Sequence, residues 1–245
     1  MKILPLGLLT AIAFPLSLQA QLGDVGSQID WGTSVLPQTF LNSSGSGFDI
    51  ADPSVDIELG AFTPGFVPTI DNLNDWIANW QVFDAINVGD EDSADTRFTT
   101  GPSAPRFAGT DFLLADQTSS SGDAQVSSAN TFAIGQQAYV FIRDSDQPVP
   151  GAEWLLYTNE DPVDAWTFPA GSDGQQAGIP LSWVLQEADT AVIGSINTNT
   201  VGGGEFTDPG GDFDFQTHTF VPEPSAALLL MLGSLGLVGR RHRKA

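Results

Sequence analysis

The sequence has no cysteine, and the stretch 21–221 has no lysine. Without cysteine the chain can form no disulfide framework, no thiolate metal site and no cysteine nucleophile. The stretch 21–221 contains 29 acidic side chains against three arginines, Arg97, Arg106 and Arg143. Proteins that bind nucleic acid need a basic face, so this charge balance excludes a nucleic-acid partner.

Histidine is almost absent as well, since the chain has two. His218 is the one in the central part, and it lies in an alternating segment, which predicts a strand residue rather than a general base. No GxSxG turn accompanies it, and no glycine-rich phosphate loop precedes a predicted helix. The motifs of nucleophilic and phosphoryl-transfer catalysis are therefore missing, and we predict a protein that is not an enzyme.

Apolar residues are plentiful despite a formal net charge of -22. Hydrophobic residues make up 41% of the chain, with 16 Phe and 6 Trp, so the central part can bury a core. Disordered acidic segments lack aromatics, which predicts that this part is folded. The 26 Gly and 16 Pro favour many turns over long helices.

The central part predicts a mainly β domain over residues 21–220. In 54–62 the apolar residues Val55, Ile57 and Leu59 alternate with polar ones, as in a half-buried strand. Similar short runs are separated by Gly, Pro and Ser clusters, which is typical of a β-sandwich or jelly roll. The further candidate strands are 29–35, 106–114, 138–143, 153–158, 181–186, 191–196 and 212–220.

One segment predicts a helix instead. Between residues 71 and 83 the apolar positions Leu73, Trp76, Ile77, Trp80 and Phe83 recur every three or four residues, which is the spacing of one helical face. Asp71 or Asn72 is a suitable N-cap for it. We expect one short helix here, packed against the edge of a sheet.

The first 20 residues have the layout of a secretory signal peptide. Lys2 precedes an apolar run, and Ala20 provides a small residue before the polar sequence begins. We therefore expect an apolar signal helix over 1–20, export, and removal of this segment by signal peptidase.

The last 25 residues combine a short motif, an apolar run and a basic end. Pro222, Glu223 and Pro224 precede 14 uncharged residues from Ala226 to Gly239, which predict a second apolar helix. A stable membrane helix needs about 20 apolar residues, so this helix is short for a permanent anchor. Positive charges stay in the cytoplasm, which places the central part outside. The basic cluster consists of Arg240, Arg241, Arg243 and Lys244.

This three-part end, residues 221–245, resembles the PEP-CTERM sorting signal of bacterial exosortase substrates. The resemblance implies transient anchoring in the inner membrane, processing by an exosortase near Pro222–Pro224, and delivery to the cell surface or an exopolysaccharide matrix. The central part has only a loose likeness to other bodies that precede such tails, and this likeness brings no activity with it.

Calcium is the ligand that the acidic composition favours most, because its sites use carboxylate and carbonyl oxygens. Three acidic clusters are candidates, although none has EF-hand spacing. The alternative for each is a solvated loop. The candidate ligands are Asp90 and Asp92, Asp144 and Asp146, and Asp208, Asp212 and Asp214.

Tryptophan suggests contact with sugars, because flat aromatic faces stack on sugar rings. Trp31 and Trp166 lie in polar surroundings, so we predict these two as exposed candidates for glycan binding. Two carboxylates at a suitable distance suffice for glycoside hydrolysis. With 29 acidic residues, however, any fold will place some carboxylates at such a distance, so this observation carries little weight. The leading hypothesis is an exported adhesive or structural protein that contacts exopolysaccharide. A carbohydrate-binding module and a two-carboxylate hydrolase are the alternatives.

Overall fold

A computed structural model describes residues 26–33, 38–86, 96–99, 105–172, 180–197, 199–201 and 213–220. The predicted signal peptide at 1–20 and the tail at 221–245, with their two expected helices, lie outside the described residues. Within the described ranges, no helix is long and apolar enough to cross a membrane.

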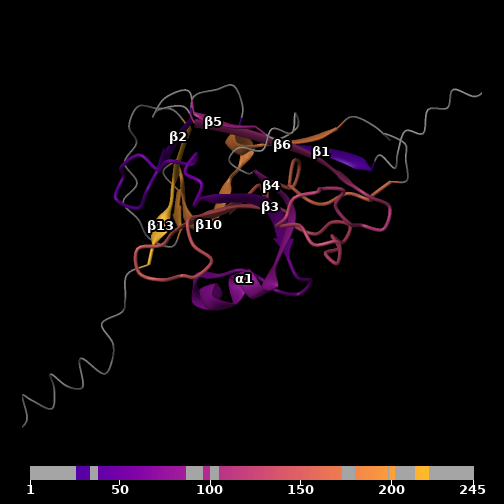
Figure 1. The fold of residues 1–245 in the computed structure, drawn as a ribbon, viewed down its shortest axis with the longest axis horizontal. Helices are drawn as coiled ribbons and strands as arrows, with labels where there is room; N and C mark the ends of the chain where they lie inside the picture. The colour runs from indigo at the N-terminus through magenta and orange to yellow at the C-terminus, as the bar shows by residue number, and fades with distance from the viewer. Residues whose placement is uncertain are drawn as a thin grey trace, which may run out of the picture.

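The described residues form two sheets, and the mainly β class predicted from sequence is confirmed (Figure 1). The four-stranded sheet has the order β5 (Thr96–Thr99), β6 (Pro105–Leu113), β1 (Ser27–Gly32) and β9 (Leu181–Val184). The nine-stranded sheet runs β2 (Gln38–Leu41), β12 (Phe213–Gln216), β10 (Thr190–Ile196), β8 (Glu153–Thr158), β7 (Tyr139–Arg143), β3 (Asp56–Phe62) and β4 (Trp80–Ile86), with β11 (Asn199–Val201) on β10 and β13 (His218–Thr219) on β8.

Strand pairing is antiparallel except in two places. β1 pairs in parallel with β9, and β2 pairs in parallel with β12. The second pair joins segments about 175 residues apart, Phe213 facing Gln38 and Gln216 facing Leu41. An early and a late strand of the body are thereby neighbours in the larger sheet.

The main core lies between the two sheets. Side chains of the smaller sheet, such as Ile29 and Phe107, share one buried cluster with Leu59 and Leu155 of the larger one. This burial explains the alternation that the sequence shows, because every second residue of β3 faces this core. The two sheets thus pack as layers around one core, which supports the mainly β class and is coarser than the β-sandwich or jelly roll expected.

A second, aromatic cluster lies on the opposite face of the larger sheet, below which Figure 1 shows the helical segment. This segment consists of a 3₁₀ helix at Ile70–Asp75 followed directly by α1 (Trp76–Asn79). Trp76 is fully buried and packs against Phe62, Phe141 and Trp154, with ring centroids 5.7–5.9 Å apart. The helical segment thus covers a face that sequence alternation had left to solvent.

The helix predicted over 71–83 exists only in part: it begins as a 3₁₀ helix whose N-cap is Thr69, not Asp71 or Asn72, and it ends before residue 83. The chain leaves the helical conformation after Asn79, so Trp80 and Phe83 lie in β4. Trp80 faces the aromatic cluster and Phe83 the main core, as alternating strand residues do. Pairing of β4 with β3 along its full length outweighs the helical spacing of its apolar residues.

Candidate functional site

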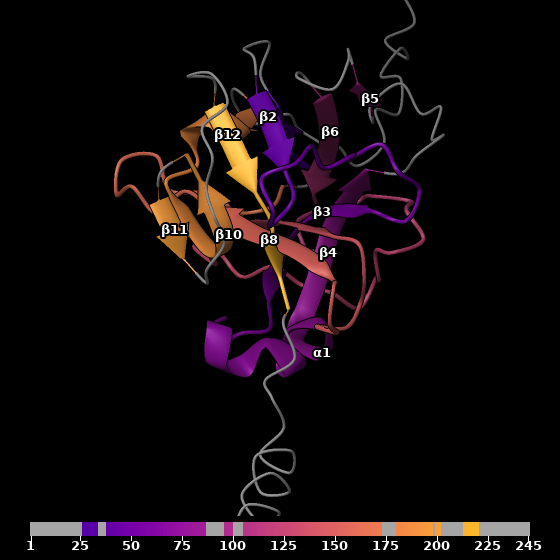
Figure 2. The same cartoon turned by 90° about the vertical axis from the view of Figure 1, so that its left-hand side faces the viewer.

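The end of the folded chain is the part of the body that adjoins the predicted sorting motif. After β12, the chain passes Thr217 and pairs through β13 with the start of β8, His218 facing Trp154 and Thr219 facing Glu153. Figure 2 shows these C-terminal strands descending beside β8 and ending next to α1. The chain therefore leaves the body on the side that carries the helical segment.

Phe220 is fixed to the body by its backbone and by its ring. The Gly151 N–H donates a hydrogen bond to the Phe220 carbonyl at 3.2 Å. The ring meets Trp154 edge-on at 5.1 Å between centroids, within the aromatic cluster. This attachment holds the chain two residues before Pro222.

Glu153, the first residue of β8, also fixes the chain where it leaves the body. Its carboxylate accepts hydrogen bonds from the Ser43 backbone N–H at 3.1 Å and from the Ser43 hydroxyl at 2.6 Å. It also accepts one from the Thr217 hydroxyl at 2.5 Å. One acidic side chain thus links β8, the turn after β2 and the residue that precedes β13.

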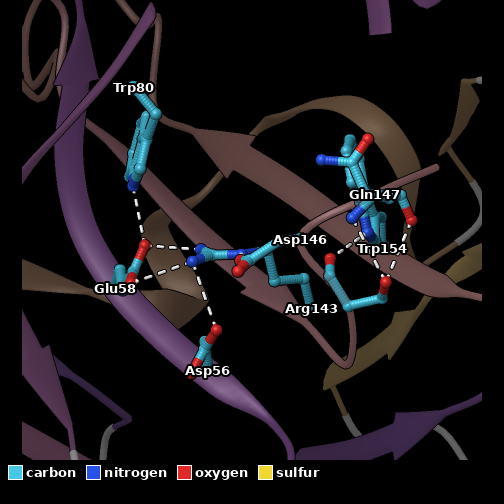
Figure 3. A network of polar contacts seen from close by, with 8 residues as sticks. Asp56, Glu58, Trp80, Arg143, Asp146, Gln147 and Trp154 are labelled. Atoms are coloured by element: carbon cyan, nitrogen blue, oxygen red, sulfur yellow. Dashed lines mark hydrogen bonds and ion pairs between the residues drawn. The ribbon is translucent and has the colours of Figure 1, made fainter. Parts of the chain in front are cut away.

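The loop 144–152 lies beside Phe220 and is held by the ionic network of Figure 3. Arg143, at the end of β7, binds both Glu58 carboxylate oxygens at 2.5 and 3.1 Å. Its guanidinium also contacts Asp56 at 3.2 Å and, through Nε, Asp146 at 3.1 Å. Trp80 Nε1 donates to Glu58 at 2.7 Å. The network joins β3, β4 and β7 to the loop.

The burial of this network determines its electrostatics. Glu58 is 1% exposed and Arg143 6%. Burial alone would lower the pKa of Arg143, but the charge of Glu58, the Glu58 hydrogen bond and the charge of Asp56 raise it above its ordinary value. Arg143 therefore stays charged, and the bidentate geometry suits a structural role. Sequence alternation placed Glu58 toward solvent and gave no signal of this pair.

The second acidic cluster proposed for calcium lies in this loop, and other protein groups contact its carboxylates. Asp146 binds Arg143, and Asp144 Oδ1 accepts a hydrogen bond from the Glu153 N–H at 2.8 Å. Asp214 lies in β12 and is buried. Among the described residues, no three His, Cys, Asp or Glu side chains lie close enough to hold a metal ion. Outside the described residues lie Asp90, Asp92, Asp208 and Asp212.

The predicted exposure of Trp31 and Trp166 is wrong. Trp31 is 3% exposed and its Nε1 donates to Asp84 at 2.5 Å. Trp166 is 0% exposed and packs against Tyr157 and Trp183. Their polar sequence neighbours point elsewhere while the indoles enter the core between the sheets. Neither face is open for a sugar ring to stack on.

Asp111 in β6 is a buried carboxyl that the sequence analysis did not single out. It is 5% exposed and accepts hydrogen bonds from the Ser119 and Ser120 hydroxyls. Burial raises its pKa above the ordinary 3.8, although these hydroxyl hydrogen bonds oppose the shift. No feature of its sequence neighbourhood distinguishes it from the other 22 aspartates of the body.

This shift predicts how stability depends on pH at Asp111. The folded state holds the Asp111 proton more tightly than the unfolded state, so stability from this group is present below the ordinary pKa and is lost as pH rises through the folded-state value. We expect Asp111→Asn to become more stable relative to the parent protein between pH 3 and pH 7. Urea unfolding at a series of pH values measures this difference.

Asp52 provides the matched control because its pKa shift has the opposite sign. Hydrogen bonds from the Ser54 backbone and side chain lower the pKa of this exposed carboxyl. Its contribution is present above the ordinary pKa and is lost as pH falls, so Asp52→Asn should become less stable relative to the parent over the same rise in pH. Parallel curves for Asp111→Asn and the parent would contradict the assigned shift.

Comparison with known families identifies the C-terminal segment. Residues 220–244 match the family model of the PEP-CTERM protein-sorting motif, which confirms the resemblance seen in Pro222–Pro224 and the basic end. The chain is accordingly an exported protein targeted to exosortase, its processing partner. Searches of curated proteins and of solved structures return no match to the chain.

Proposed function

We propose that this protein is a non-enzymatic component of the cell surface or of an exopolysaccharide matrix, released from its tail by exosortase. The observation that carries the proposal is a sorting motif that follows a folded, acidic β body without an intervening linker. The signal peptide at 1–20 delivers the chain across the inner membrane, and the tail at 221–245 holds it there until processing. The body then acts as an adhesive or structural unit.

The contacts inside the body support this role. Arg143, Glu58 and Glu153 use their charges to join strands and loops into one rigid unit. The proposed surface is acidic, since the stretch 21–221 has 29 acids against three arginines. Acidic surfaces and anionic polysaccharides repel each other, so adhesion would use a divalent cation as a bridge, and calcium suits oxygen ligands.

Deleting the exosortase tests the sorting part of the proposal. In the parent strain we expect a shortened protein at the cell surface or in the matrix, whereas the deletion strain should accumulate the longer form in its membranes. Replacing Pro222, Glu223 and Pro224 by alanine should reproduce the deletion phenotype in the parent. Equal length and equal location in both strains would contradict exosortase processing.

Calcium removal tests the adhesive part. The processed protein, purified from the parent strain, should be retained on an anionic polysaccharide in calcium and released by a chelator. The control is sodium chloride of matched ionic strength, which screens charge without bridging. Retention that is the same in both salts would contradict calcium bridging, and turnover of the polysaccharide would favour the hydrolase alternative.

A further inference from the structure

The fixed position of Phe220 limits how far the sorting motif can lie from the body. The Phe220 carbonyl is bonded to Gly151 and its ring is packed on Trp154. Pro222 follows two residues later, which is roughly 7 Å of extended chain. The apolar run begins at Ala226, roughly 20 Å of extended chain beyond Phe220. An enzyme that holds Pro222–Pro224 therefore comes into contact with the surface around Phe220.

That surface is the loop 144–152, which contacts with the body hold in place. Trp154 Nε1 donates to the Ser145 carbonyl at 2.8 Å, and Arg143 holds Asp146. At the tip of the loop, Val149 stands between two prolines and is 48% exposed. A rigid apolar tip costs little conformational entropy on binding, which is a property of good contact surfaces.

Charge decides between a protein and a lipid bilayer as the occupant of this surface. Arg143 is a cation that contacts the loop, and three carboxylates surround it. Membranes with anionic lipids attract basic segments and repel acidic ones. Asp144 and Asp146 precede the apolar tip in the same loop, so the surface fits a protein with an apolar contact and a neutral or basic rim.

We infer that the loop 144–152, together with the clamped Phe220, is a docking surface for the outward-facing part of the exosortase that processes this chain. The inference rests on the proposed function, since it assigns a surface to the enzyme named there. It adds that the enzyme binds the folded body as well as the tail.

Photocrosslinking in living cells tests the inference on the full chain. A photoreactive amino acid replaces Val149 in one variant and Val163 in another. Val163 is 84% exposed and lies beyond the opposite end of β8, so it is a matched surface control. We expect an exosortase adduct at position 149 that exceeds the one at 163 by about tenfold and disappears in the deletion strain. Equal adducts at both positions, or an adduct at 149 that persists without exosortase, would overturn the inference.

A kinetic test gives an independent result. Val149→Asp should slow processing about five- to tenfold, because it places a charge at the apolar contact, while Val163→Asp should process at the parent rate. The melting temperatures of both variants are measured alongside, so that unfolding is recognised. Normal processing of Val149→Asp together with no adduct at 149 would overturn the docking surface and leave exosortase processing itself intact. If the protein were processed equally in the parent strain and in the exosortase deletion strain, the proposed function itself would be refuted.

Discussion

Replacing Arg143 with methionine is expected to lower the free energy of unfolding by about 3–5 kcal/mol. The methionine keeps an unbranched apolar side chain at this position but leaves Glu58 buried without its bidentate partner. A buried charge that loses its counter-ion costs more than the intact pair contributes, because its desolvation is no longer compensated. Trp80 Nε1 remains as a donor to Glu58 and limits the loss.

Three further variants separate the buried pair from the exposed part of the network. Asp146 is 67% exposed at its side chain, so Asp146→Asn should cost at most about 1 kcal/mol. In the double variant Arg143→Met with Glu58→Gln, the loss should be smaller than the sum of the single losses, since no uncompensated charge remains. Urea unfolding measures the parent, the single variants Arg143→Met and Glu58→Gln, their double variant, and Asp146→Asn. A loss below about 1 kcal/mol for Arg143→Met would contradict the desolvation argument.

Local patterns predicted most of the strands because each strand has one face in the core between the sheets. The segments 153–158 and 138–143 are strands in the structure as expected. The same patterns did not predict the second aromatic cluster. In β3 the polar residue Glu58 alternates with apolar residues, a pattern that indicates a solvent-exposed face. In the structure, Trp80 and the helical segment cover this face. Covering of that kind depends on contacts distant in sequence.

The segment 71–83 shows how tertiary pairing overrides periodicity. Trp76, Trp80 and Phe83 have helical spacing, and a helix over all of them would place all three rings on one side. In the structure Trp76 and Trp80 enter one cluster and Phe83 the other. The backbone gains ladder hydrogen bonds with β3 from residue 80 onward, and a helix would forgo them.

The sorting motif was predictable because all its parts lie within 25 consecutive residues. Its attachment was not, because it depends on residues about 70 positions away, Gly151 and Trp154. The pairing of β12 with β2 is still more distant and leaves no trace in the spacing of Phe213–Gln216. The sorting motif is a continuous stretch of sequence, so it can be recognised locally. The surface next to it is formed by residues that only the fold brings together.

Trp166→Ala is expected to lower the free energy of unfolding by about 3–5 kcal/mol, the usual loss for a fully buried tryptophan. The indole is 0% exposed and lies against Trp183 and Tyr157, so its removal leaves a cavity between the sheets. Its Nε1 has no hydrogen-bond partner among the described residues, so Trp166→Phe leaves no acceptor without its donor. Trp166→Phe should therefore lower the free energy of unfolding by less than Trp166→Ala does.

This series also decides between the core role of Trp166 and the glycan-binding role that its polar sequence surroundings suggested. A core residue destabilises the fold when truncated, in the order alanine more than phenylalanine, and loses glycan retention only as far as the protein unfolds. A binding residue would lose retention at an unchanged melting temperature. Calorimetry and polysaccharide retention on the same preparations measure both quantities. Because burial leaves no aromatic face for a sugar ring, we expect the first result, and it would direct the search for the polymer contact to the acidic loops.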